Sequence, residues 1–289
     1  MMLRSLCLLA PFALLACTPD GTGNKDKTDP ATDADADGLL DTEESSFGTD
    51  PALTDTDGDG LTDKQEFDLG TDGTSVDTDG DGYTDRDESV EGSDPTDGES
   101  LIYDGHWPYY AEKDGIDDPG FDGNGREGRT FGRFVGPDQF GQEVDVYDYA
   151  GQGKLTVIDL SGIWCYYCNE MAKWMEGRRS FLDDYADSYP FVDELPGMVA
   201  DGRLQWVTIL DSDANGQSIE VDEQAGWAED YENDKIAVLG DVDVILATYL
   251  GVAGFPTVLV VDENMEIVSY NQQDYFEGLQ YAYDNTPAE

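Results

Sequence analysis

A chain of 289 residues is long enough to bury one good core and to carry accessory segments. Its 15 lysines and arginines stand against 65 aspartates and glutamates, which gives a formal net charge of −50. Such acidity excludes a nucleic-acid partner, because that partner needs a basic surface, and it argues equally against an anionic bilayer surface. It favours multivalent cations as partners, or simple solubility.

The first residues indicate export. Arg4 precedes an apolar run from Leu6 to Leu15, and this run is shorter than the ~20 apolar residues that a transmembrane helix needs. We therefore interpret residues 1–16 as an export signal that is removed from the mature protein.

The end of this signal carries a resemblance. Leu14-Leu15-Ala16-Cys17 is similar to the lipobox of bacterial lipoproteins. The resemblance implies that Cys17 is acylated and anchors the protein to a membrane, and that residues 17–32 form a disordered tether. Thr18, where an aspartate could stand, implies the outer membrane. The alternative is an ordinary signal peptide with an incidental cysteine.

Residues 33–99 form an acidic segment that repeats. Its copies start at Asp33, Asp55 and Asp77, so the period is 22 residues. Each copy has acidic residues at positions 1, 3, 5, 9 and 12 of a twelve-residue loop, with Gly at position 6 and an apolar residue at position 7. A calcium loop offers oxygens from positions 1, 3, 5, 7, 9 and 12, turns sharply at position 6, and uses only the backbone carbonyl of position 7. The predicted calcium ligands are Asp33, Asp35, Asp37, Leu39, Asp41 and Glu44; Asp55, Asp57, Asp59, Leu61, Asp63 and Glu66; and Asp77, Asp79, Asp81, Tyr83, Asp85 and Glu88.

These copies resemble thrombospondin type 3 calcium repeats, which implies a calcium-dependent spacer. They resemble EF-hands less, because 22 residues leave no room for two helices around each loop. We expect a segment with little regular structure, and a disordered acidic tether is the alternative. A degenerate fourth match starts at Asp211, and there a simple strand-to-helix loop is favoured over a calcium site.

Residues 100–128 contain turn signals and predict a linker. Its aromatic residues Trp107, Tyr109 and Tyr110 suggest that the linker docks against another part of the chain. His106, the one histidine, has no second imidazole to pair with and is interpreted as a surface residue.

From residue 129 onward, strand and helix patterns alternate, which predicts an α/β domain over 129–289 with a central mixed sheet flanked by helices. The expected strands are Phe131–Val135, Glu143–Tyr147, Leu155–Leu160, Leu204–Leu210, Thr257–Val261 and Glu266–Tyr270. The expected helices are Asn169–Arg178, Val221–Tyr231, Val242–Leu250 and Tyr275–Tyr283.

Two cysteines, Cys165 and Cys168, stand two residues apart between an expected strand and an expected helix. This spacing can close a small reducible disulfide, and a helix N-terminus favours the thiolate of the first cysteine. A structural zinc site would need four Cys or His ligands, which the chain cannot supply here. A purely structural disulfide is the alternative, although so short a loop gives little entropic stabilisation.

Residues 129–286 resemble the thioredoxin-fold, membrane-tethered thiol–disulfide oxidoreductases of bacterial envelopes. The resemblance lies in Trp164-Cys165-Tyr166-Tyr167-Cys168, in Asp159 six residues before the first cysteine, and in Gly254-Phe255-Pro256-Thr257 before an apolar strand. It implies that Cys165 attacks, that Cys168 resolves the mixed disulfide, and that Asp159 accepts the proton of Cys168. It also implies a cis peptide bond at Pro256, a substrate-pairing backbone at Phe255, and a shielding or core role for Trp164.

The leading hypothesis is therefore an exported lipoprotein that holds a thiol–disulfide oxidoreductase on calcium-binding repeats. Its expected partners are protein dithiols or disulfides and an envelope electron donor or acceptor, and we expect no cofactor in the redox domain beyond the disulfide. Tyr166 and Tyr167 supply no positive charge to stabilise a thiolate further, which favours a reductase mildly over a strong oxidant. The rival hypothesis is a non-enzymatic calcium-binding surface protein that uses the thioredoxin fold as a scaffold.

Overall fold

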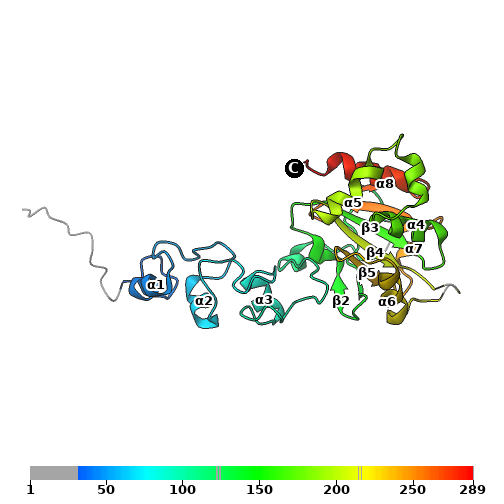
Figure 1. The fold of residues 1–289 in the computed structure, drawn as a ribbon. Coiled ribbons are helices and arrows are strands. Elements are labelled where there is room, and N and C mark those ends of the chain that lie inside the picture. Colours follow the sequence, from blue (N-terminus) through cyan, green and yellow to red (C-terminus); the bar gives the residue numbers. More distant parts are fainter. Residues whose placement is uncertain (1–31, 122, 124, 214, 216, 289) are drawn as a thin grey trace, which may run out of the picture.

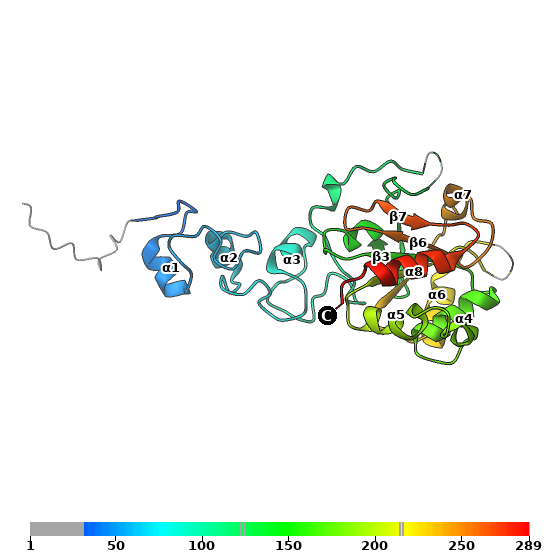
Figure 2. The ribbon, with the colours of Figure 1, turned by 90° about the horizontal axis from the view of Figure 1, so that it is seen from above.

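The computed structural model describes residues 32–121, 123, 125–213, 215 and 217–288. The three repeats form a row that extends from a larger C-terminal domain (Figures 1 and 2). Each repeat contains one seven-residue helix: α1 (Asp41–Phe47), α2 (Asp63–Leu69) and α3 (Asp85–Glu91). The segment thus has more regular structure than the sequence predicted, with one helix per repeat.

Local signals explain the limits of these short helices. The hydroxyls of Thr62 and Thr84 accept hydrogen bonds from the third residues of α2 and α3, which caps the free amides there. Gly48, Gly70 and Gly92 follow the three helices in the left-handed conformation that ends a helix at low cost. The period of 22 residues therefore contains one loop, one helix and one glycine stop.

The C-terminal domain is built on a five-stranded mixed sheet with the order β5-β4-β3-β6-β7. The strands are β3 (Thr156–Ser161), β4 (Gln205–Leu210), β5 (Ile236–Gly240), β6 (Thr257–Val261) and β7 (Ile267–Tyr270). Strands β3, β4 and β5 are parallel, whereas β6 runs antiparallel to both β3 and β7. The predicted mixed sheet is confirmed, and β3 lies at its centre with every residue buried.

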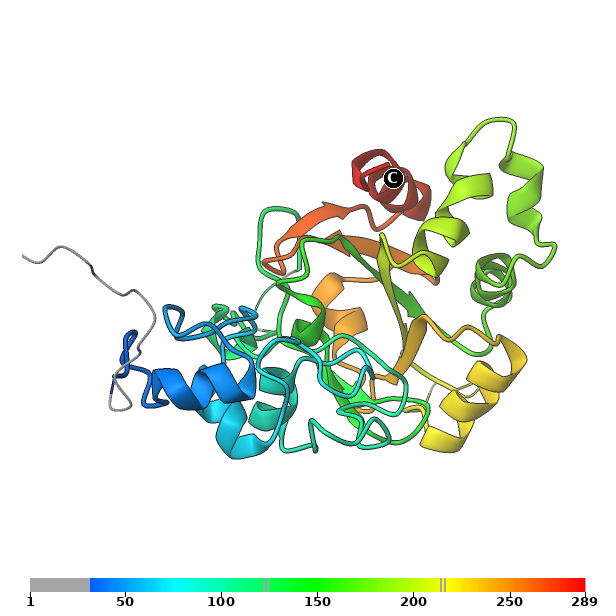
Figure 3. The same cartoon turned by 60° about the vertical axis from the view of Figure 1, so that its left-hand side comes forward.

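Helices cover both faces of this sheet (Figure 3). Helices α4 (Tyr166–Met175), α5 (Phe191–Ala200) and α8 (Tyr275–Asn285) share one apolar cluster with Val157, Val258 and Val260. Ile158, Leu160 and Val261, whose side chains alternate to the other face, cluster with α7 (Leu246–Leu250). Helix α6 (Val221–Asp230) packs along β5.

The chain enters this domain through a small antiparallel hairpin of β1 (Val135–Pro137) and β2 (Glu143–Asp145). The 3-10 helix η2 (Val146–Tyr149) follows, because the Asp145 carboxylate accepts a hydrogen bond from the Tyr147 amide and turns the chain out of the strand. The strand expected at Phe131–Val135 is therefore misplaced, and the strand expected at Glu143–Tyr147 is too long.

The long stretch between α4 and β4 folds into the 3-10 helix η3 (Phe181–Tyr185) and α5. Its rings pack edge to face on α8, with Tyr185 and Phe191 both against Phe276. This packing explains how the stretch between α4 and β4 is held beside the sheet.

The predicted linker is folded against the domain. Ile102, Tyr103, Trp107 and Tyr109 are buried in the apolar cluster that also contains η2 and one face of the sheet, and the short 3-10 helix η1 (Lys113–Gly115) follows them. His106 is exposed, as expected. Within the described part of the chain, no helix is long and apolar enough to cross a membrane.

Candidate redox site and calcium loops

The two cysteines form a disulfide at the N-terminus of α4, with their Cα atoms 5.3 Å apart. Cys165 is the N-cap residue of the helix, and its Sγ accepts a hydrogen bond from the Cys168 amide at 3.2 Å. Cys165 is 5% exposed, whereas Cys168 is fully buried. The first cysteine is therefore the one that another molecule can reach more easily.

Asn169 stabilises this turn by hydrogen bonds, a role that the sequence analysis did not predict. Its amide nitrogen donates to the carbonyls of Ile163 and Cys165, at 3.1 and 2.6 Å. Its carbonyl oxygen accepts a hydrogen bond from the Tyr231 hydroxyl on the C-terminal side of α6. An asparagine directly after the second cysteine was the only available signal, and its partners lie too far along the chain to be inferred.

Trp164 and Phe255 flank the disulfide from two different loops. Their rings meet edge to face with centroids 5.9 Å apart, and Phe255 packs on the cluster that contains both cysteines. Trp164 is 53% exposed and donates from Nε1 to the Ser212 hydroxyl at 3.3 Å, so the alternative of a core role is excluded. The peptide bond between Phe255 and Pro256 is cis, as the resemblance implied.

Asp159 lies on β3 and is buried behind α4. Its oxygens accept hydrogen bonds from the Ser161 hydroxyl at 2.8 Å and the Thr208 hydroxyl at 3.4 Å. Burial raises the pKa of Asp159 to about 7, and these two hydrogen bonds offset only part of that effect. Asp159 and Met171, which follows Cys168 by three residues, line one small cavity of about 30 Å³. A carboxyl that is partly protonated near neutral pH can exchange a proton with a buried thiol.

The two residues between the cysteines are both exposed. Tyr166 is 63% and Tyr167 52% exposed, and their rings touch edge to face. Tyr167 continues onto Phe181 of η3, with centroids 5.2 Å apart. An aromatic surface therefore surrounds the disulfide, which suits contact with an apolar polypeptide segment.

The acidic loops of the three repeats bring together the side chains of positions 1, 3 and 5. In each copy the three aspartates place oxygens within 4.8 Å of one another: Asp33, Asp35 and Asp37; Asp55, Asp57 and Asp59; and Asp77, Asp79 and Asp81. The glycines at position 6 have φ angles of 104° to 105°, a conformation that side-chain-bearing residues rarely adopt. The predicted sharp turn is thus present in all three loops.

The glutamates at position 12 are the most informative residues of the loops. Glu44, Glu66 and Glu88 are fully buried, and neither oxygen of Glu44 or Glu66 has a hydrogen-bond partner. Burial, followed by the neighbouring aspartates, raises the pKa of Glu66 to about 8 and those of the other two to about 7. Buried carboxylates without partners are costly unless a cation compensates them. These all-oxygen loops therefore fit a hard divalent ion such as Ca²⁺.

The aspartates at position 9 have partners of their own. Both oxygens of Asp63 accept hydrogen bonds from Thr56, one from its amide and one from its hydroxyl, each at 2.8 Å. Asp85 holds Thr78 in the same way, and Asp41 accepts from the Ala34 amide at 2.9 Å. These three side chains stabilise the loop backbone by accepting hydrogen bonds from its amides. This role distinguishes them from the glutamates at position 12.

The degenerate fourth match belongs to the C-terminal domain. One oxygen of Asp213 accepts from the amides of Asn215 and Gln217, which makes a turn after β4. Among the described residues, neither Asp211 nor Asp213 belongs to a cluster that could hold a metal ion. This agrees with the favoured strand-to-helix loop. The predicted signal peptide, the acylated Cys17 and the predicted tether up to residue 31 lie outside the described residues.

Comparisons with known proteins match these two parts of the chain separately. The family model of the bacterial TSP3 repeat matches residues 33–53, 55–72 and 77–98. A comparison with curated proteins finds no match.

Among solved structures, a putative thiol:disulfide interchange protein DsbE from Chlorobium tepidum is 17% identical, with a TM-score of 0.39 over 56% of this chain and 99% of that one. A putative protein disulfide isomerase from Bacteroides thetaiotaomicron is 16% identical, with a TM-score of 0.37 over 56% and 91%. A thioredoxin-like protein from Bacteroides caccae is 10% identical, with a TM-score of 0.41 over 56% and 50%.

The strand order, the disulfide between β3 and α4 and the cis-proline before β6 define a thioredoxin-like domain. Three bacterial TSP3 repeats precede this domain in the chain.

Proposed function

We propose that this chain is a thiol–disulfide oxidoreductase of the bacterial cell envelope, carried on calcium-binding repeats and tethered by a lipid on Cys17. The main support for the oxidoreductase part of this proposal is the position of the disulfide. Cys165 stands at the accessible end of α4, Cys168 is buried one turn further, and the buried carboxyl of Asp159 lies behind that helix. A structural disulfide would need neither the exposed aromatic rim nor this carboxyl.

In the reducing direction, the Cys165 thiolate attacks one sulfur of a substrate disulfide. That bond breaks, the other substrate sulfur leaves as a thiolate, and a mixed disulfide joins Cys165 to the substrate. Cys168 then gives its proton to the Asp159 carboxylate and attacks the Cys165 sulfur, which releases the second substrate thiolate. An envelope dithiol donor restores the reduced pair, and an oxidant of exported proteins would run the same steps in reverse.

The substrate would lie along the Phe255 backbone, next to the disulfide. An extended polypeptide could pair with this backbone as an added strand. The exposed rings of Trp164, Tyr166 and Tyr167 would contact the residues on either side of the substrate cysteine.

The calcium part of the proposal rests on the buried glutamates of the loops. In each loop the aspartates at positions 1, 3 and 5, the carbonyl at position 7 and the glutamate at position 12 would hold the ion. The ion would neutralise carboxylates that otherwise repel one another, and so would keep the row of repeats ordered.

The redox assignment can be tested with the full chain in which Cys7 and Cys17 are replaced by serine, so that Cys165 and Cys168 are its only thiols. We expect the pair to cycle in glutathione or dithiothreitol buffers. A potential near about −270 mV would identify a reductase, and one nearer about −120 mV an oxidant of exported proteins. A pair that cannot be cycled in either buffer would overturn the oxidoreductase proposal in favour of the non-enzymatic scaffold.

The calcium assignment predicts three sites, one for each acidic cluster. Two adjacent glutamates of α1 provide a matched test, because Glu44 is buried without partners whereas Glu43 is exposed and caps the helix. In calorimetric titrations, Glu44→Gln is expected to lose one of the three sites, since an amide is a weaker calcium ligand than a carboxylate. Glu43→Gln is expected to keep all three. Absence of calcium binding to the parent chain would contradict the assignment.

A further inference from the structure

The repeats are linked to one another by a contact that recurs. The Asp37 carboxylate in the first loop accepts a hydrogen bond at 2.9 Å from the backbone amide of Lys64 in the second helix. One period later, the Asp59 carboxylate accepts at 3.0 Å from the amide of Arg86 in the third helix. Position 5 of each of these loops thus holds the next helix of the row, and the third loop meets the linker instead.

Tyr83 is the residue with which the third loop contacts this linker. It occupies position 7, whose backbone carbonyl is the predicted calcium ligand, and its side chain is buried with Tyr103, Trp107 and Tyr149 in one apolar cluster. Its hydroxyl donates to the Trp107 carbonyl at 2.8 Å. Positions 7 of the first two loops are leucines, which have no hydroxyl to make such a bond.

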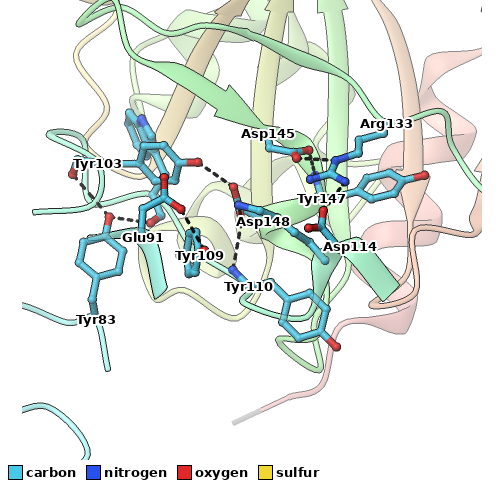
Figure 4. A network of polar contacts seen from close by, with 12 residues as sticks. Tyr83, Glu91, Tyr103, Tyr109, Tyr110, Asp114, Arg133, Asp145, Tyr147 and Asp148 are labelled. Carbon is cyan, nitrogen blue, oxygen red and sulfur yellow. Dashed lines mark hydrogen bonds and ion pairs between the residues drawn. The ribbon is translucent and has the colours of Figure 1, made fainter. Parts of the chain in front are cut away.

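Helix α3 adds two more contacts beside Tyr83. The Tyr109 hydroxyl donates to the Glu91 carboxylate at 3.0 Å, and Arg86 pairs with Glu112 at 2.5 Å. Figure 4 shows the Tyr83 and Glu91 side chains facing the linker tyrosines. The third repeat therefore holds the linker by one buried anchor and two polar contacts.

The linker is in turn fixed to the redox domain by Asp148 of η2, which is fully buried. Its carboxylate accepts hydrogen bonds from the Tyr103 hydroxyl at 2.7 Å and the Tyr110 amide at 3.1 Å (Figure 4). It also pairs with Lys113 at 2.6 Å. Trp107 also donates from its indole nitrogen to Asp138 at 2.8 Å. A continuous set of contacts thus runs from the third calcium loop to the face of the sheet opposite α4.

We infer that calcium in the third loop clamps the row of repeats onto the redox domain through Tyr83. This clamp fixes the position of the disulfide relative to the tether. This inference rests on the calcium binding proposed above. The ion would be held by the carbonyl of the same residue whose side chain is the buried anchor. Without the ion, the unpartnered oxygens of Asp79, Asp81 and Glu88 would repel one another, the loop would open, and Tyr83 would leave the cluster.

The test uses the full chain with Cys7 and Cys17 replaced by serine, in excess calcium and in chelator. Calcium is expected to raise the melting temperature of the redox domain by about 3 °C or more, because the ion orders the loop that docks on this domain. In Tyr83→Ala this rise should be lost, while calorimetry still finds three bound ions. Leu61→Ala, at the same position of the second loop, is the matched control and should keep the rise.

Trypsin provides a second measurement that needs no variant. Lys113 belongs to the linker and is held against buried Asp148. Under the proposal, removal of calcium releases Tyr83 and loosens the linker. Chelation is therefore expected to accelerate cleavage after Lys113. Equal cleavage rates with and without calcium, or equal calcium-dependent melting shifts in Tyr83→Ala and its parent, would overturn the clamp. Because calcium binding is measured on the same samples, a chain that binds calcium without these effects contradicts only the clamp. A chain that binds none contradicts the calcium proposal as well.

Discussion

Replacement of Cys165 by serine is expected to lower the rate of disulfide reduction to that measured without protein. A serine hydroxyl is not ionised near neutral pH and cannot form a mixed disulfide, so the first step is lost. The fold should persist, because the serine oxygen can still accept the hydrogen bond that Cys165 receives from the Cys168 amide. Reduction of insulin disulfides with dithiothreitol as donor measures this loss, and circular dichroism checks the fold.

Cys168→Ser is the matched variant and should behave differently. Cys165 can still attack, but nothing resolves the intermediate, so a mixed disulfide with the substrate should accumulate and appear as one adduct on a non-reducing gel. The same adduct in Cys165→Ser would reverse the two roles. This outcome is not expected, because Cys168 is fully buried beneath the first turn of α4.

The features that depend on short-range pattern could be predicted from the sequence. The three acidic repeat loops follow from a fixed period and fixed positions, and the central strand β3 follows from a continuous apolar run ahead of the cysteines. The roles of individual oxygens could not be predicted. The aspartate at position 9 matches a calcium loop in sequence, yet in the structure Asp63 binds Thr56 of its own loop with both oxygens.

The region around β5 was predicted wrongly for a local reason. The strand Ile236–Gly240 was missed, and the helix expected over Val242–Leu250 is limited to Leu246–Leu250. Asp241 explains the late start, because its two oxygens accept hydrogen bonds from the amides of Ile245 and Leu246. Val244 has a positive φ of 52°, which is incompatible with a helix at that point. Helix propensity alone does not show that this cap delays the start of the helix.

The linker could not be predicted for a different reason. Its aromatic residues indicated docking, but they follow no helical or strand period, so their partner surface was not defined. The structure places Tyr103 on Asp148, 45 residues further along the chain. Such a contact depends on the completed fold, and it is one of the contacts that fix the linker to the C-terminal domain.

Asp159→Asn is expected to change how stability depends on pH. Burial raises the pKa of Asp159 to about 7 from the reference value of 3.8, so the folded chain binds more protons than the unfolded chain between these values. The contribution of Asp159 to the free energy of unfolding is therefore greatest below about pH 4 and is lost as the pH rises to 7. A shift of this size corresponds to a loss of the order of 4 kcal/mol. Asparagine cannot ionise, so the variant should escape this loss.

Guanidinium unfolding of the oxidised chains at pH 5, 6, 7 and 8, in constant calcium, measures the effect. The parent contains other buried carboxyls that titrate in this range, such as Glu66, so the informative quantity is the difference between variant and parent at each pH. This difference should move in favour of Asp159→Asn as the pH rises. Asp222→Asn, on the exposed side of α6, should show no such trend. A difference that stays constant from pH 5 to 8 would mean that Asp159 does not change its protonation in this range, and its role as proton acceptor for Cys168 would then be untenable.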